Sequence, residues 1–394
     1  MLKKLITVVC AAAVCFSFLS GCINYIPVNP SDSSSGDSGM TPSDDPARAV
    51  NVIVADGEEL KKYYDESAAA KIARAGESVV TVVASYADGK GGTTKKTESG
   101  IVLGASEGSS YVVVSHHLIE GATTVGIYVN GNETAIASTY LGTDPQTDLC
   151  VLNVKKELTP AVIAETLYDD DGNEYSSVGR GVFTVSDALG KNANIVTKGI
   201  ICGQNYKYSV GEGKYERYLL TDAFVGSAST GGGLFSEDGG LLMGVINASI
   251  ESGGEWKGYV LPIDTVLKVF NEIVSNPEHC VTGRYKLGFA VEDVRTSWGP
   301  TESVKFTEVS RDGSFYAGGN GVKTGDLIKA FRLEDDESWT EVGTAEEMYD
   351  WFYVRLADRL KVGVTVYFRI ERNETRDDIQ IKIQQYKYSS VDRY

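Results

Sequence analysis

Short apolar runs separated by turn-forming residues fill most of the chain after residue 78. β-Branched residues dominate the runs Val79 to Ser85, Tyr111 to Ser115 and Leu149 to Val154. Many short strands with loops between them are typical of a β-sandwich or a barrel. A helical period appears only near the end of this region, from Asp264, where apolar residues recur on one face. The pattern predicts a mostly β domain over residues 66–280 that closes with a helix.

A second pattern of strands begins near Gly283 and predicts a separate α+β domain over residues 281–388. A helix is expected from Ala345, because Thr344 and Glu347 have the spacing of a capping box. The strands are expected at residues 304–309, 327–331, 364–370 and 379–383. With 394 residues, 42% of them hydrophobic, the chain is long enough for two packed cores.

The first residues have the order of a signal peptide, with Lys3 and Lys4, an apolar run and then small residues, so residues 1–21 are expected to be removed. Leu-Ser-Gly directly before Cys22 resembles the bacterial lipobox, which implies that Cys22 is acylated. An ordinary secretory signal is the alternative. Residues 22–65 are rich in Ser, Pro, Gly and Asp near their start and are expected to form a flexible linker. The expected location is the cell envelope, lipid-anchored to a membrane on its extracytoplasmic side.

Charge and cysteine content narrow the classes of partner and cofactor. The net charge of -17 becomes -19 once Lys3 and Lys4 leave with the signal, which disfavours nucleic acid. Three cysteines remain in the folded body, too few and too scattered for a disulfide framework, and they are expected to be small core residues: Cys150, Cys202 and Cys280. The acidic residues 169–174 lack the alternation of a calcium loop and are expected to be a solvated loop. No metal or organic cofactor is expected.

Two segments of the mostly β domain carry the residue types of nucleophilic catalysis. Residues 114–122 read Val-Ser-His-His-Leu-Ile-Glu-Gly-Ala, and residues 142–149 read Gly-Thr-Asp-Pro-Gln-Thr-Asp-Leu. They resemble the histidine and aspartate segments of the HtrA-type, trypsin-like serine proteases. The resemblance spans about residues 66 to 277 and implies a trypsin-like double β-barrel. It also implies that His117 is the general base and that Asp148 orients it.

The nucleophile segment departs from the family. The family reads Gly-Asn-Ser-Gly-Gly-Pro, whereas residues 228–233 read Ala-Ser-Thr-Gly-Gly-Gly, so Thr230 takes the catalytic position ahead of Gly231. Threonine keeps a hydroxyl, but its β-branch restricts the rotamer. Ala228 stands where an oxyanion-hole glycine is expected and has less freedom in φ. A one-residue shift that makes Ser229 the nucleophile is the alternative register.

Phe224 lies six residues before Thr230, where the resemblance places the base of the primary specificity pocket. Its ring is expected either to fill that pocket or to pack in the core.

The second domain resembles a PDZ domain over about residues 283–386. Leu287, Gly288 and Phe289 resemble the loop that binds a peptide carboxylate. Such domains bind a peptide C-terminus by strand addition, which here implies a groove between residues 288–294 and the helix 345–356. A PDZ-shaped spacer with no functional groove is the alternative.

These observations support two functional hypotheses. The first is an extracytoplasmic HtrA-like serine endopeptidase homologue that acts on unfolded or C-terminal segments of envelope proteins, with turnover weakened by Thr230. The second is an inactive pseudoprotease that serves as a peptide-binding or envelope scaffold lipoprotein. The sequence leaves open whether copies of the chain form a homo-oligomer.

Overall fold

The computed structural model describes residues 50–55, 57–129, 134–164, 177–187, 194–211, 214–247, 257–295, 301–356 and 358–386. The chain forms two compact units. Among the described residues, the first contains residues up to 207 and residues 217–280, and the second contains residues 208–216 and those from 281 onward. The predicted signal peptide, Cys22 and the acidic residues 169–174 lie outside the described residues.

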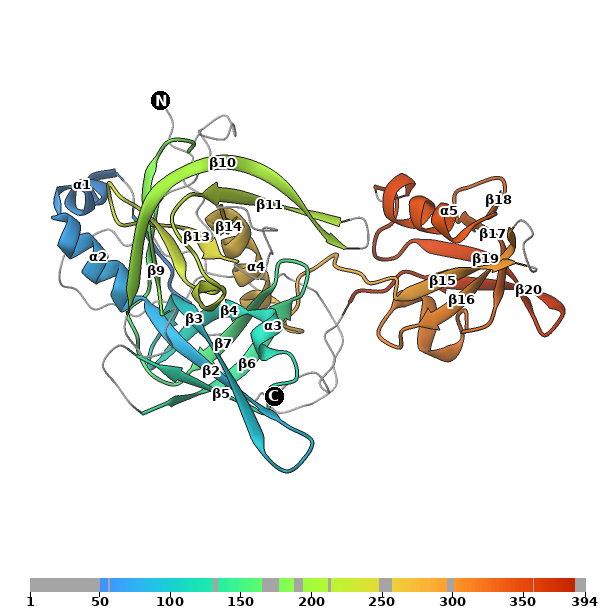
Figure 1. Cartoon of the computed structure of the whole chain (residues 1–394), viewed down its shortest axis with the longest axis horizontal. Coiled ribbons are helices and arrows are strands. Elements are labelled where there is room, and N and C mark those ends of the chain that lie inside the picture. The colour runs from blue at the N-terminus through green and yellow to red at the C-terminus, as the bar shows by residue number, and fades with distance from the viewer. Residues whose placement is uncertain are drawn as a thin grey trace, which may run out of the picture. The chain divides into compact units, whose positions relative to one another are not determined.

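Six antiparallel strands close into the first barrel of unit 1, in the order β2-β3-β4-β7-β6-β5 (Figure 1). Its interior is filled by inward-facing apolar side chains such as Val82, Ile127 and Leu152, none of which is exposed. The strands are β2 (Val79–Ala87), β3 (Thr93–Ser106), β4 (Ser109–Ser115), β5 (Thr124–Tyr128), β6 (Ile136–Asp144) and β7 (Leu149–Val154).

A second barrel follows in the chain and also contains six strands. It runs β12-β9-β10-β11-β14-β13 and closes where β13 pairs with β12, while β8 and then β1 extend the sheet beyond β13. The strands are β1 (Ile53–Ala55), β8 (Val162–Ala164), β9 (Gly181–Ser186), β10 (Ile195–Gly211), β11 (Lys214–Thr221), β12 (Gly233–Ser236), β13 (Leu242–Ile246) and β14 (Gly258–Pro262). The predicted fold, mostly β with a trypsin-like double barrel, is confirmed.

The predicted closing helix is α4 (Ile263–Ser275), which buries Val266, Phe270 and Ile273. Phe270 meets Tyr111 of the first barrel edge-to-face, with ring centroids 6.3 Å apart. Because α4 also contacts β13 and β14, it packs against strands of both barrels.

Two helices occupy a segment for which the sequence indicated none. α1 (Gly57–Asp65) lies in the last part of the predicted linker, and α2 (Ala68–Glu77) opens the predicted β domain. α1 is mostly polar and α2 is rich in alanine, so the two helices contain few large apolar residues. Their stability comes from tertiary contacts, including a bond from Lys71 Nζ to Tyr64 O at 2.9 Å and an ion pair from Arg74 to Glu66 at 3.0 Å.

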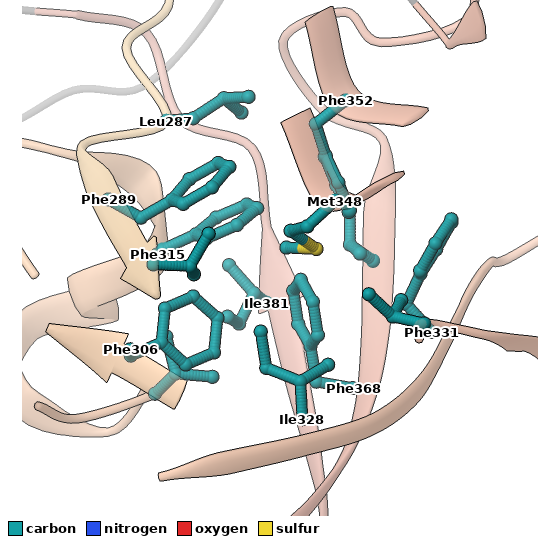
Figure 2. Close-up of a cluster of buried hydrophobic side chains, with 14 of the residues drawn as sticks. Leu287, Phe289, Phe306, Phe315, Ile328, Phe331, Met348, Phe352, Phe368 and Ile381 are labelled. Carbon is teal, nitrogen blue, oxygen red and sulfur yellow. The ribbon is translucent and has the colours of Figure 1, made fainter. Parts of the chain in front are cut away.

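Unit 2 contains a sheet in the order β15-β16-β17-β19-β20, with β18 paired to β17. Its core is unusually aromatic, and Phe289 and Phe315 lie in it as parallel rings (Figure 2). The elements are β15 (Phe289–Arg295), β16 (Thr301–Val309), η2 (Ser314–Gly319), β17 (Leu327–Leu333), β18 (Thr340–Glu341), α5 (Ala345–Asp350), the π-helical turn η3 (Trp351–Arg355), β19 (Thr365–Arg372) and β20 (Thr375–Lys382).

The predicted cap of α5 forms in part. The Thr344 hydroxyl accepts the backbone N–H of Glu347 at 3.1 Å, as expected. The Glu347 carboxylate, however, accepts the N–H of Gly343 at 2.8 Å, one residue earlier than in a capping box.

Cys150, Cys202 and Cys280, the cysteines within the described residues, are free thiols. Cys150 and Cys280 are buried, but Cys202 is only partly buried, so the core interpretation is wrong for Cys202. In the part of the chain that the structure describes, no helix has the length and apolarity needed to cross a membrane.

Candidate active site

His117 and Asp148 meet where two strands of the first barrel end. His117 lies in the short helix α3 (His116–Ile119) directly after β4, and Asp148 directly precedes β7, the partner of β4. The backbone N–H of His117 donates to Asp148 Oδ1 at 2.9 Å, and His117 Nδ1 lies 2.7 Å from Asp148 Oδ2. Asp148 therefore accepts two hydrogen bonds from one residue, which fixes the orientation of the imidazole.

Asp148 adopts an uncommon backbone conformation at this position. Its φ is +58°, in the left-handed region that aspartate tolerates better than most residues. The carbonyl of Asp148 accepts the N–H of His116 at 2.9 Å, so both of the adjacent histidines are tied to this one residue.

His116 has a different environment from its neighbour. Its side chain is buried, and its Nδ1 lies 3.1 Å from the hydroxyl of Thr143, which itself donates to the carbonyl of Leu149. Burial lowers the pKa of His116, so the neutral form is favoured. The geometry thus separates a buried histidine from His117, whose side chain is 36% exposed.

Glu98, which the sequence alone did not indicate, contacts the second ring nitrogen of His117. Glu98 Oε1 lies 2.9 Å from His117 Nε2, and its second oxygen accepts the hydroxyl of Ser115. Glu98 shares a face of β3 with Gly100, whose added Cβ would touch Val82 in the barrel interior. Because alternate residues of a strand share a face, the Glu98 carboxylate points, like position 100, toward the barrel interior, at the end where α3 begins.

The two carboxylates decide the protonation state of His117. Burial alone would lower the pKa, but hydrogen bonds and charge from Asp148 and Glu98 outweigh it and raise the pKa of His117 to about 10. The imidazole is then a doubly protonated cation at neutral pH, donating Nδ1–H to Asp148 and Nε2–H to Glu98. A general base must have a free nitrogen to accept a proton, which this cation lacks.

Thr230 follows a tight turn, η1 (Ser227–Ser229), and directs its polar groups back into that turn. Its hydroxyl donates to the carbonyl of Ser227 at 2.9 Å, and its backbone N–H points to the same carbonyl at 3.2 Å. Among the described residues, no hydrogen bond joins the Thr230 hydroxyl to His117. One of the two backbone donors expected of an oxyanion hole is thus already satisfied internally.

The rest of the nucleophile loop is fixed by packing against β3 and β13. Ser229 is buried, and its hydroxyl accepts hydrogen bonds from Ser186 Oγ and from Gly226 N, each at 3.2 Å. Gly231 has a φ of +78°, and a Cβ there would lie 2.1 Å from the carbonyl of Ser99. Only glycine fits at that position. Ala228 lies within the turn η1 itself.

The predicted catalytic residues converge on one region of unit 1. Asp148 and Thr230 line the same small cavity, together with Ser115 and Gly231, and the backbone N–H of Ser99 donates to the carbonyl of Thr230 at 3.0 Å. Glu98 is thereby carried next to the nucleophile loop.

Phe224 does not pack in the core, one of its two predicted places, because its side chain is 76% exposed. Its carbonyl accepts the hydroxyl of Thr197 at 2.8 Å. Its predicted place at the base of the primary specificity pocket stays a prediction.

The predicted peptide-binding loop of unit 2 precedes the edge strand β15. Leu287 is buried, and its carbonyl accepts the N–H of Phe315 at 3.1 Å. Gly288 has a φ of +71° and packs so closely on Gly313 that an added Cβ would lie 2.6 Å from the Gly313 Cα. Phe289 is 9% exposed and begins β15.

Comparison with known proteins shows which family unit 1 is similar to. Residues 98–245 match the family model described as a trypsin-like peptidase domain. A Do-like HtrA serine protease of Lactobacillus helveticus is 27% identical over 302 residues, covering 73% of this chain and 68% of that protein. A Do-like HtrA serine protease of Bacillus subtilis is 26% identical over 196 residues, covering 48% of this chain and 42% of that protein. A probable periplasmic Do/HhoA-like serine protease of Haemophilus influenzae is 25% identical, covering 62% and 51%.

Two solved structures are among those that match. The HtrA-type protease AlgW with a decapeptide matches with a TM-score of 0.47 at 20% identity, covering 81% of this chain and 98% of that one. The serine endoprotease from Yersinia pestis matches with a TM-score of 0.47 at 22% identity, again over 81% and 98%. The chain thus contains a trypsin-like peptidase domain over residues 98–245 and is similar to HtrA-type serine proteases.

Proposed function

We propose that this chain is an extracytoplasmic, peptide-binding HtrA-type homologue with little or no peptidase turnover. It would engage unfolded or C-terminal segments of envelope proteins through unit 2, while unit 1 serves as a scaffold. Of the two hypotheses from the sequence, the geometry of unit 1 favours the pseudoprotease.

The observation that carries this proposal is the pair of carboxylates on His117. Glu98 lies 2.9 Å from Nε2, the nitrogen that would have to accept the proton of a nucleophilic hydroxyl. With a pKa of about 10, His117 keeps that proton at any pH near neutrality. Thr230 therefore has no base, and its own hydroxyl donates elsewhere.

The oxyanion side of the site supports the same conclusion. Acyl transfer needs donors aimed at the developing oxyanion, and losing one of them costs about 3 kcal/mol of transition-state stabilisation. The Thr230 N–H already points to Ser227 O at 3.2 Å. Turnover would require this bond, the Thr230 hydroxyl bond and the Glu98 contact all to break together.

A latent protease is the second candidate, favoured by the intact contact of 2.7 Å between His117 and Asp148. In that case a ligand would withdraw Glu98 and reopen the turn η1. Thr230 would then attack as a hindered nucleophile.

The location rests on Cys22 and on the relatives. A lipobox-like Leu-Ser-Gly-Cys places the acylated residue ahead of a linker, and one relative is described as a probable periplasmic protease. A lipid anchor would hold both units on the extracytoplasmic face of a membrane.

The proposal is tested by treating the purified mature protein with a fluorophosphonate probe and with fluorescent casein. We expect no labelling and no cleavage above that of His117→Ala. Labelling at Thr230 with casein cleavage at the rate of an ordinary protease would contradict the proposal, and labelling at Ser229 would show that the alternative register is right.

The anchor is tested separately in cells. We expect Cys22→Ala to abolish incorporation of labelled fatty acid and to move the protein from the membrane to the soluble fraction. Retention of both label and membrane association by this variant would exclude Cys22 as the anchor.

A further inference from the structure

Strand β15 lies at the edge of its sheet. In the order β15-β16-β17-β19-β20 it pairs with β16, and no other strand of the described residues lies on its far side. Alternate residues of an edge strand direct their backbone groups outward, where an added strand would bind. Here the outward N–H of Val291 already has a partner, because it donates to the hydroxyl of Tyr349 on α5 at 3.1 Å.

Contacts on both sides of Val291 join β15 to the same helical segment, which consists of α5 and η3. Two residues further along β15, Asp293 Oδ1 accepts the backbone N–H of Ala345 at 2.7 Å. Two residues earlier, the ring of Phe289 stacks on Tyr353, with centroids 5.5 Å apart and planes 10° apart.

The spacing of these contacts is regular. Steps of two residues along a strand cover about 6.6 Å. Steps of four residues along a helix cover about 6.0 Å. Positions 293, 291 and 289 of β15 can therefore each meet a successive turn of the helical segment, at 345, 349 and 353. The segment is fastened along the strand edge rather than merely lying beside it.

Tyr349 is central to this arrangement because its ring and its hydroxyl make different contacts. Its ring stacks on Phe289 at 5.7 Å and on Tyr353 at 5.8 Å, which fixes the ring in place. Its hydroxyl then occupies the backbone site on Val291 that the carbonyl of an added peptide strand would need.

We propose that Tyr349 is an autoinhibitory gate of the groove between β15 and α5, and that an extended peptide binds there only after displacing the Tyr349 hydroxyl from the Val291 N–H. This inference rests on the proposed peptide-binding function and adds a gate to it. The affinity of the groove is reduced by the fraction of molecules in which the gate is open.

The test compares wild type with Tyr349→Phe, which keeps the ring stack and removes only the hydroxyl. The probe is a biotinylated peptide pool with four randomised C-terminal residues and a free carboxylate, so no single sequence has to be guessed. We expect Tyr349→Phe to retain about fivefold to tenfold more of the pool than wild type, as loss of one competing hydrogen bond implies.

The amidated pool and a matched tyrosine serve as controls. Tyr367→Phe removes a hydroxyl from β19, away from the β15 edge, and should leave retention at the wild-type level. Hydrogen exchange of the Val291 amide in the full chain gives a readout without ligand, and this amide should exchange about fivefold to tenfold faster in Tyr349→Phe.

The outcomes distinguish a failure of the Tyr349 gate from a failure of the proposed peptide binding. Equal retention by wild type and Tyr349→Phe, with unchanged exchange at Val291, would overturn the gate and leave peptide binding standing. Faster exchange with no retention by either protein would contradict both the gate and the proposed peptide binding. A gain that is the same for the amidated pool would support the gate and show that the carboxylate is not what the groove recognises.

Discussion

The His117 site and the β15 groove are each occupied by a side chain of the protein itself, but by different chemistry. In unit 1 a carboxylate takes the nitrogen that a nucleophile would use, and in unit 2 a phenol takes the amide that a peptide would use. The first contact joins charged partners and the second joins neutral ones. Charge-assisted hydrogen bonds are roughly twice as strong as neutral ones, so the first is expected to be much harder to displace.

The difference suggests distinct roles for the two contacts. A contact worth about 1 kcal/mol can be displaced by a ligand of modest affinity. A cation held between two carboxylates changes only if a charge is removed or a proton is lost. The groove is thus suited to opening in response to a peptide, whereas the catalytic site is suited to remaining closed.

The largest effect is expected from removing Glu98 in a repaired catalytic loop. Ala228→Gly with Thr230→Ser should cleave fluorescent casein less than tenfold faster than wild type, because His117 is still protonated. Adding Glu98→Ala should raise the rate at least a further hundredfold, since it frees Nε2 as a base.

The matched control for this experiment is Glu77→Ala in α2, an exposed acid of the same unit. It should add nothing to the double variant, and His117→Ala should abolish any gain. Full activity of the double variant without Glu98→Ala would show that Glu98 does not block the base.

A smaller effect is expected on the pH dependence of stability. Because the folded pKa of His117 is raised to about 10 from 6.5, the folded state binds the proton more tightly than the unfolded state. This contribution is complete below pH 6.5 and is lost as the pH rises toward 10. We expect about 1 to 2 kcal/mol of unfolding free energy to be lost over this interval, the pKa shift being discounted because the ring is 36% exposed to solvent.

Urea unfolding of unit 1, followed at pH 6.5 and pH 10, measures this dependence. His117→Gln should flatten it, because glutamine fills a similar volume and does not titrate. An equally steep loss in wild type and His117→Gln would assign the dependence to other groups.

The smallest effect is expected at the groove. Tyr349→Phe should lower the unfolding free energy of unit 2 by about 1 kcal/mol or less, the usual contribution of one neutral hydrogen bond. Urea unfolding followed by the aromatic circular dichroism of unit 2 measures it. A loss above 3 kcal/mol would make Tyr349 a structural residue and weaken the comparison with Glu98.

Local sequence was enough to predict the strands of both units and the pair His117 and Asp148, because the signals lie within a few residues of one another. Glu98 could not be predicted. It is one of 54 acidic residues, and its contact with His117 depends on the register of β3 and on the barrel closing. The Tyr349 contact likewise joins residues 58 positions apart. The helices α1 and α2 were not predicted because both are short and contain few large apolar residues.

The π-helical turn after α5 contains one residue more than an α-helix would use, since Leu356 N bonds Trp351 O at 2.9 Å. Such a turn is what an insertion into a regular helix leaves behind. Deleting exposed Val354 would leave a turn of α-helical length, in which the Leu356 N–H could still reach the carbonyl of Trp351, so Leu356, now 3% exposed, would keep its place in the core. A gain or loss of one residue in this turn is therefore absorbed locally, and such length variants are expected to fold with the core of unit 2 unchanged.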